Sequence, residues 1–466
     1  MRNPHLRLAS SILVCLCILV AYVLFTLAFL PKTPGISILM LNTEVYESVK
    51  QALAEDWTRL LLPFEYETFA GGRIYWISST IPLVYAGQVY LGPLGSYLLF
   101  STLFISTSFV LALIVSRSLE FAATLAFLFA FGTQLNYAYT YGGLILLYLV
   151  LTYAGINFAI GFLLISGRIS GWRWQLGFAA SLCLVALSSE FWINYAVAVI
   201  VATGFGAAWA RRHGQRQPGS SMLIVLATTI AVLAAYLTIR LRAPGQFVAP
   251  GVEEELAIFY RHETLLAEDL IVNFFTYLYM VLTNYLPSFI TSSNSLTYLG
   301  PDVIVAEQNG YDAPHQALVV MSHLFLWRFY AGILTTLFIG FLGYASVRAW
   351  RTPSVPPALI TALALMMLAG FSTHLLIKMR PYMSVPALGY KAVISIAFWT
   401  ILLTYLTTTS RKVVDSSRAH IILVACVWLS AFLAALTRPG MQARALAEVG
   451  LLGLRDPLGD MLQWLK

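Results

Sequence analysis

The chain has 466 residues and a net charge of +7, yet only 11% of its residues are charged and 59% are hydrophobic. A soluble domain has about 25% charged residues, and many apolar runs here approach the roughly 20 residues that span a bilayer. This composition excludes an ordinary soluble protein. It predicts an all-α polytopic membrane protein, residues 1–466 forming a single transmembrane domain, and its basic excess points to membrane topology rather than nucleic acid.

The first apolar run covers residues 8–30 and follows a short basic N-terminus. It is long for the apolar core of a signal peptide, and the sequence PKTPG follows it in place of a small-residue cleavage site. We therefore expect an uncleaved first transmembrane helix.

Eleven apolar runs are predicted to span the membrane. They lie at 8–30, 93–115, 119–135, 143–166, 174–188, 192–210, 221–239, 320–345, 357–376, 386–408 and 419–436. With the N-terminus inside, the inner segments contain two acidic residues, Glu120 and Asp415, against a large excess of basic ones, as the positive-inside rule requires. The C-terminus is then outside. The Arg-rich, Lys-poor composition favours a bacterial inner (plasma) membrane.

Two apolar stretches do not fit one span each. Residues 175–210 are too long for a single helix, and we divide them at SSEFW, residues 188–192. Leu270–Ile290 is long enough to span, but a span there would reverse every later basic loop. We expect it to form an interfacial or re-entrant helix at the outer surface, where its many Tyr and Phe side chains suit the headgroup region.

Two large outer segments remain, residues 31–92 and 240–319, and both are expected to contain surface helices. The inner loops are short. Residues 252–270, in the second segment, form an acidic amphipathic pattern. Because binding and catalytic residues concentrate in long connecting segments, function is expected on the outer face.

The first outer segment contains LNTEVYESVKQALAEDW, residues 41–57. Apolar residues recur at every fourth position from Val45 to Trp57, which predicts an amphipathic helix. Thr43 can cap this helix, and Glu44 then lies in its first turn, where the helix dipole stabilises a carboxylate. Glu44 is therefore either a solvated residue at the start of an interfacial helix or a catalytic carboxylate at the membrane surface.

A second acidic stretch, FEYETFAGGR, covers residues 64–73. Glu65 and Glu67 would point to the same side of an extended segment, and paired carboxylates can bind a divalent cation. The alternative is a solvated turn that ends at the two glycines, with Arg73 neutralising the pair.

Two further outer positions are candidates for a binding pocket. Tyr139 belongs to a run of alternating tyrosines, which an interfacial aromatic belt explains and which could instead stack on a sugar. Glu190 is the acid that we place within the spans, and Trp192 follows it. Intramembrane acids are costly and usually functional, so Glu190 is either a cap in a tight hairpin or part of an active site.

The most basic outer loop is HLLIKMRPYMSVPALGYK, residues 374–391. Short basic clusters beside spans often contact anionic lipid headgroups, and the alternative is a site for the phosphate of a substrate. Arg380 is favoured for phosphate because its guanidinium is a planar fork of donors. The other candidates in this loop are His374, Lys378, Tyr382 and Lys391.

The stretch NTEVYESVKQALAEDW, directly after a first transmembrane helix, resembles the first outer loop of the GT-C superfamily of polyprenyl-phosphate-sugar-dependent glycosyltransferases. In the protein O-mannosyltransferases and the aminoarabinose transferase of that superfamily, an acidic pair opens a surface helix and an aromatic residue follows. Glu44 matches the second acidic position and Tyr46 lies close to the aromatic one. Thr43 stands where the family has an aspartate.

The resemblance implies a transferase that works outside, where nucleotide sugars are absent, and that therefore uses a lipid-linked donor. Glu44 would be the general base. Arg380, Lys378, Lys391 and His374 would bind the donor phosphate. Glu65, Glu67 and Glu190 would lie near the acceptor or a metal, and Tyr46, Tyr139, Trp192 and Tyr382 would line the pocket. A divalent cation is neither required nor excluded by the sequence.

The expected function is thus the transfer of a sugar from a polyprenyl-phosphate donor to a glycan, lipid or protein acceptor on the extracytoplasmic face. A secondary transporter or flippase of a lipid-linked or small anionic substrate is the alternative, and Glu190 with the break in residues 175–210 favours it. A third hypothesis is a non-catalytic membrane scaffold, favoured by Thr43 in place of an aspartate.

Overall fold

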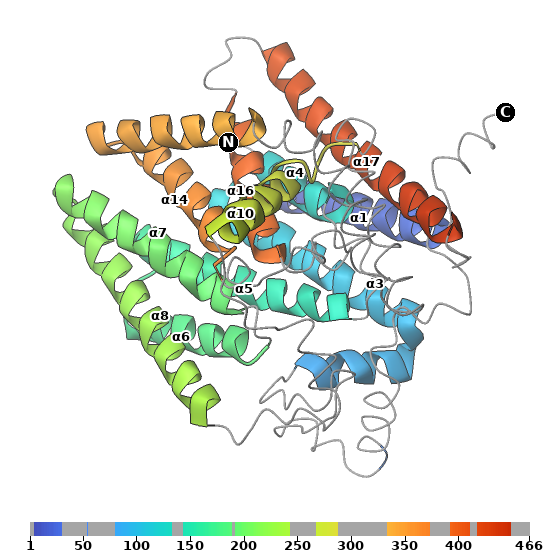
Figure 1. Cartoon of the computed structure of the whole chain (residues 1–466), viewed down its shortest axis with the longest axis horizontal. Coiled ribbons are helices and arrows are strands. Elements are labelled where there is room, and N and C mark those ends of the chain that lie inside the picture. The colour runs from blue at the N-terminus through green and yellow to red at the C-terminus, as the bar shows by residue number, and fades with distance from the viewer. Residues whose placement is uncertain are drawn as a thin grey trace.

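The computed structural model covers the whole chain and describes residues 4–29, 54, 80–132, 143–188, 192–242, 267–287, 333–372, 392–410 and 417–448. These residues form helices and the short turns between them, and the described part of the chain contains no strand (Figure 1). The all-helical class that the sequence predicts is confirmed.

Each predicted apolar run overlaps a helix in the described residues. The helices are α1 Pro4–Phe29, α3 Thr80–Ser116, α4 Leu119–Phe127 continued by the π-helix η2 Leu128–Gly132, α5 Gly143–Ile165, α6 Trp172–Ala186, α7 Trp192–Arg212, α8 Arg216–Arg242, α10 Ala267–Leu282, the Ile333–Arg351 helix, α14 Val355–Ala369, α16 Val393–Thr409 and α17 Ser417–Glu448. Within the described ranges, seven segments are long and apolar enough to cross a membrane. The protein is an integral membrane protein on this basis, and the count of eleven spans stays a prediction.

The break predicted in residues 175–210 is confirmed. Helix α6 ends at Ala186 and α7 begins at Trp192. Helix α3 also has a break, because Gly92 adopts a φ of 70°, a left-handed conformation that glycine adopts without steric cost. The spanning part of α3, Leu94–Ser116, begins directly after this kink.

Helix α10 falls in Leu270–Ile290, which the sequence predicts to be an interfacial or re-entrant helix, and several of its aromatic residues are buried against other helices. Tyr277, Tyr279 and Tyr285 are at most 4% exposed, and α10 packs against α16 (Figure 1). Aromatic residues fit a protein interior as well as a membrane interface, and composition alone could not separate the two. Whether the helix is interfacial or re-entrant stays a prediction.

Several contacts join helix ends that the positive-inside rule assigns to the inner face. They are Trp209 Nε1 to the Ala349 carbonyl at 2.9 Å, His420 Nε2 to Glu120 Oε1 at 2.5 Å, and Arg168 Nη1 to the Val115 carbonyl at 2.5 Å. In each pair the two residues come from different helices or their flanking turns. The pairing of ends therefore agrees with the predicted alternation of the helices, although it does not show on which side of a membrane they lie.

Candidate functional site

Of the twelve residues that the sequence predicts for the site, one lies in the described part of the chain, Trp192 at the start of α7. The others lie outside the described residues: Glu44, Tyr46, Glu65, Glu67, Tyr139, Glu190, His374, Lys378, Arg380, Tyr382 and Lys391. The structure therefore describes the helices from which these segments depart, and the roles of the residues stay predictions.

Trp192 is fully buried, and its ring packs edge-on against Tyr236 of α8 with centroids 5.0 Å apart. Its indole Nε1 has no hydrogen-bond partner among the described residues. A buried indole N–H usually has one. In the sequence, Trp192 directly follows residues 189–191, which contain Glu190 and lie outside the described residues. The prediction that Trp192 lines a pocket is neither confirmed nor contradicted by this burial.

Three buried tyrosines form a hydroxyl cluster between α1, α3 and α5. Tyr22 Oη donates to Tyr97 Oη at 3.1 Å, and the hydroxyls of Tyr97 and Tyr148 are 3.2 Å apart. Each side chain is at most 1% exposed. Tyr22 lies in the last third of α1, Tyr97 follows the α3 kink, and Tyr148 lies near the start of α5. The cluster therefore lies toward the helix ends from which segments 30–79 and 133–142 depart.

The π-helix η2 links α1 to α10. Phe131 of η2 packs edge-on against Phe25 of α1, with centroids 5.6 Å apart. Asn284, just after α10, donates from Nδ2 to the Gly132 carbonyl at 2.7 Å. Helices of the π type are rare and are found often at functional sites. Here η2 ends at Gly132, where the segment containing Tyr139 begins.

Helix α10 continues this connection to α14. Tyr277 of α10 stacks on Phe371, just after α14, with centroids 5.6 Å apart. Gly370 lies so close to Ser395 of α16 that a Cβ at position 370 would overlap Ser395 Oγ. The two ends of segment 373–391, which contains Arg380, are therefore held together.

These contacts form a continuous path from α1 through η2 and α10 to α14 and α16. They link the helices that precede the segments containing Glu44, Tyr139 and Arg380, which lie far apart in the sequence. Sequence analysis missed the residues that make the path, such as Phe131, Asn284 and Tyr277. The path does not include the start of α7, so the position of Glu190 relative to the other candidates stays a prediction.

In the described ranges, no three His, Cys, Asp or Glu side chains lie together in a way that could bind a metal ion. The carboxylates predicted for a divalent cation, Glu65 and Glu67, belong to segment 30–79. That cation remains a hypothesis about this segment.

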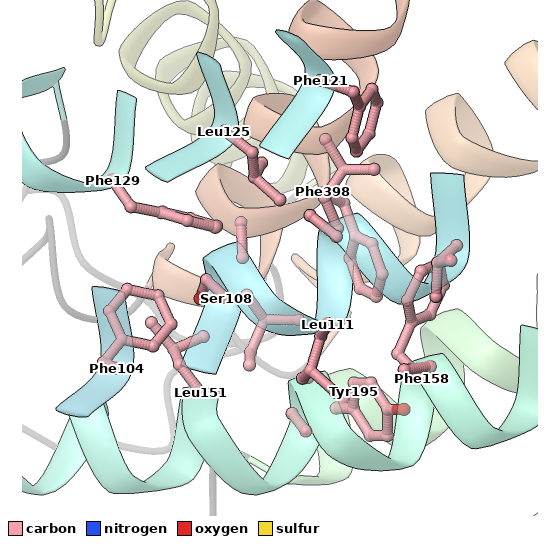
Figure 2. A pocket seen from close by; sticks show the side chains of 18 residues that line it. Phe104, Ser108, Leu111, Phe121, Leu125, Phe129, Leu151, Phe158, Tyr195 and Phe398 are labelled. Atoms are coloured by element: carbon pink, nitrogen blue, oxygen red, sulfur yellow. The ribbon is translucent and has the colours of Figure 1, made fainter. Parts of the chain in front are cut away.

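An apolar cavity of about 110 Å³ lies among α3, α4, α5 and α16. Figure 2 shows that phenylalanine and leucine side chains line most of the cavity, and that Ser108 and Tyr195 contribute hydroxyl groups to its wall. Tyr195 Oη donates to Asn157 Oδ1 at 2.8 Å. Because no charged residue lines this cavity, it is not suited to acid–base chemistry.

No family model matches the sequence, and no curated protein matches it. Among solved structures, the chain is similar to the archaeal oligosaccharyltransferase AglB from Archaeoglobus fulgidus, determined in complex with an inhibitory peptide and a dolichol-phosphate. The two share 16% sequence identity with a TM-score of 0.44. The match covers 97% of this chain and 57% of AglB, so this chain spans little more than half the length of that protein.

Proposed function

We propose that the protein is a GT-C-type integral membrane glycosyltransferase. It transfers a sugar from a polyprenyl-phosphate donor to a glycan, lipid or protein acceptor on the extracytoplasmic face of a bacterial inner membrane. The observation that supports this proposal best is the path from α1 through η2 and α10 to α14, because it joins the ends of the segments with Glu44 and Arg380. Glu44 belongs to the segment that follows α1, and Arg380 belongs to the segment that follows α14.

The proposed reaction needs two groups. Glu44 takes the proton from the acceptor hydroxyl. The oxygen of that hydroxyl attacks the anomeric carbon of the donor sugar, and the bond between this carbon and the phosphate oxygen breaks. Arg380, with Lys378, Lys391 and His374, stabilises the negative charge on the departing polyprenyl phosphate. Tyr46, Tyr139, Trp192 and Tyr382 enclose the sugar, and Glu65, Glu67 and Glu190 lie toward the acceptor.

The test is sugar transfer by the purified protein from a panel of radiolabelled polyprenyl-phosphate sugars, with slow donor hydrolysis followed in parallel. In Glu44→Gln, donor turnover is expected to fall by about 10²- to 10⁴-fold, the usual contribution of a general base, while donor binding is retained. Glu47→Gln is the matched control, because it removes one carboxylate from the same predicted helix and is expected to keep turnover near that of the wild type.

Equal turnover in Glu44→Gln and the wild type would remove Glu44 from the mechanism. Absence of turnover by the wild type with every donor would contradict the proposal for those sugars and favour the transporter or scaffold hypotheses. The Glu190→Gln variant distinguishes the transporter hypothesis from the scaffold hypothesis. A proton-coupled transporter would lose substrate flux in Glu190→Gln and keep it in Glu44→Gln.

A further inference from the structure

A second and larger apolar cavity, about 360 Å³, lies between α5, α6, α7, α8 and α14. This volume falls in the range of about 300–1,000 Å³ that is typical of ligand pockets. Aliphatic and aromatic side chains form most of its wall, including Phe178, Val199, Met222 and Leu363. A cavity with such a lining accepts a hydrocarbon chain and has little to offer a sugar.

One end of this cavity is lined by Ser166, Gln215 and Val355. Ser166 and Val355 are exposed, so the cavity opens to the outside of the protein at this end. The three residues lie in the turns after α5 and α7 and at the start of α14. These positions belong to the arginine-rich helix ends that the sequence assigns to the inner face.

Two arginines lie at helix ends close in sequence to residues of this opening, Arg212 shortly before Gln215 and Arg351 shortly before Val355. The Arg212 guanidinium lies 5.5 Å from the ring centroid of Trp350, the residue before Arg351. Trp209 lines the cavity and donates from Nε1 to the Ala349 carbonyl at 2.9 Å. The end of α7 and the end of the Ile333–Arg351 helix are therefore held together, each with an arginine.

Neither arginine is paired with an acidic side chain in the described part of the chain. The described ranges 143–188 and 192–242 contain no Asp or Glu, and Arg212 and Arg351 are both exposed. Two like charges at adjacent helix ends repel each other, and an anion bound between them removes that repulsion. The planar guanidinium fork fits a phosphate group in particular.

We propose that this end of the bundle binds one anionic phospholipid from the membrane leaflet it contacts. One acyl chain occupies the 360 Å³ cavity, and the phosphate lies between Arg212 and Arg351. The apolar wall selects the chain, and the arginines select the charge of the headgroup. The site is separate from the helix ends around η2 and α10, and it does not depend on the proposed transferase activity.

The test uses the delipidated full-length protein, titrated with phosphatidylglycerol or phosphatidylcholine and followed by native mass spectrometry. The wild type is expected to retain one phosphatidylglycerol more tightly than phosphatidylcholine. Arg351→Gln should weaken phosphatidylglycerol binding by about fivefold, equivalent to roughly one arginine–lipid contact, and leave phosphatidylcholine unchanged. Arg418→Gln is the matched control, because Arg418 lies on α17, which does not line the cavity, and its removal should change nothing.

Binding of the acyl chain in the cavity is tested with Ala362→Phe, which places an aromatic ring in the cavity. Retention of the first phosphatidylglycerol should fall by at least about tenfold, equivalent to the loss of roughly two buried methylene groups. Ala227→Phe, on an exposed position of α8 outside the cavity lining, should keep it. If Ala362→Phe does not fold, wild-type protein with a diazirine-labelled phosphatidylglycerol chain replaces it. Crosslinks are then expected at cavity residues such as Met222 and Met366.

Equal affinity for the two lipids, or equal effects of Arg351→Gln and Arg418→Gln, would overturn the assignment of the headgroup site. Unchanged retention in a folded Ala362→Phe, or crosslinks confined to the outer surfaces of the helices, would overturn the assignment of the chain. Displacement of phosphatidylglycerol by a polyprenyl-phosphate sugar at equal concentration would show that the cavity holds the donor chain, which also contradicts the proposal.

Discussion

The two ends of the helical bundle are held together by different interactions. Around η2 and α10, buried polar groups pair inside the protein, as in the Tyr22–Tyr97–Tyr148 cluster and the bond from Asn284 to Gly132. At the arginine-rich end, the Trp209 indole also makes a buried hydrogen bond, to the Ala349 carbonyl, but charged groups such as the exposed Arg212 lie on the same helix end.

This difference bears on where function is to be sought. A buried hydrogen bond in an apolar environment requires both partners at fixed positions, because an unpaired polar group there is costly. The tyrosine cluster therefore makes its end of the bundle a rigid support for a site that must place a base and a phosphate ligand. Exposed arginines at the other end suit the looser recognition of lipid headgroups.

Substituting one arginine at each end should separate their roles with the largest effect. Arg380→Gln is expected to raise KM for the lipid-linked donor by roughly 10- to 100-fold, because a hydrogen bond to a charged group contributes about 1.5–3 kcal/mol. Arg173→Gln, beside Trp172 at the arginine-rich end, removes the same charge and should leave KM unchanged. Steady-state kinetics of donor turnover provides the measurement, and equal effects of the two variants would contradict a donor site at Arg380.

The helices could be predicted from the sequence, because an apolar run of sufficient length has few alternatives in a bilayer. The break between α6 and α7 followed from the same length argument. The tyrosine cluster could not be predicted. Lipid is as apolar as a protein core. The apolar sequence around Tyr22 therefore does not indicate which face of α1 is buried in the protein. The same ambiguity hid the burial of Tyr277 and Tyr285 against other helices.

The close packing at η2 is expected to be sensitive to one methyl group. In Gly132→Ala, the new Cβ would overlap the ring of Tyr285, whose hydroxyl contacts Thr400 and whose carbonyl accepts a bond from Ser430. Overpacking of this kind costs about 1–3 kcal/mol. A lower midpoint of thermal unfolding in detergent and reduced donor turnover should follow.

Gly204→Ala in α7 is the control for Gly132→Ala. No atom lies within 4 Å of the added Cβ at this position, and alanine favours a helix over glycine by about 1 kcal/mol. The thermal midpoint should stay the same or rise. A Gly132→Ala protein as stable and active as Gly204→Ala would contradict the close packing of η2 on Tyr285.

A smaller effect is expected at the hydrogen bonds between α5, α6 and α7. Asn157 accepts from Tyr195 Oη at 2.8 Å and donates to Ser181 Oγ at 2.8 Å. Hydrogen bonds between membrane helices contribute about 0.6 kcal/mol on average, with a maximum near about 1.7. A double-mutant cycle of Asn157→Leu and Tyr195→Phe, read from denaturant unfolding, should give a coupling of this size. Zero coupling would show that the Tyr195 hydroxyl does not depend on Asn157.

The smallest effect is expected at the arginine-rich end, where Glu120 Oε1 meets His420 Nε2 at 2.5 Å and His420 Nδ1 contacts Ser410 Oγ at 2.9 Å. Glu120 is 40% exposed at its side chain, so solvent and salt screen the pair. A cycle of Glu120→Gln and His420→Gln should give a coupling of about 0–1 kcal/mol that shrinks as salt is raised, with donor turnover unchanged. A coupling that resists salt would show a neutral hydrogen bond rather than an ion pair. A loss of turnover in Glu120→Gln would contradict the assignment of function to the opposite end.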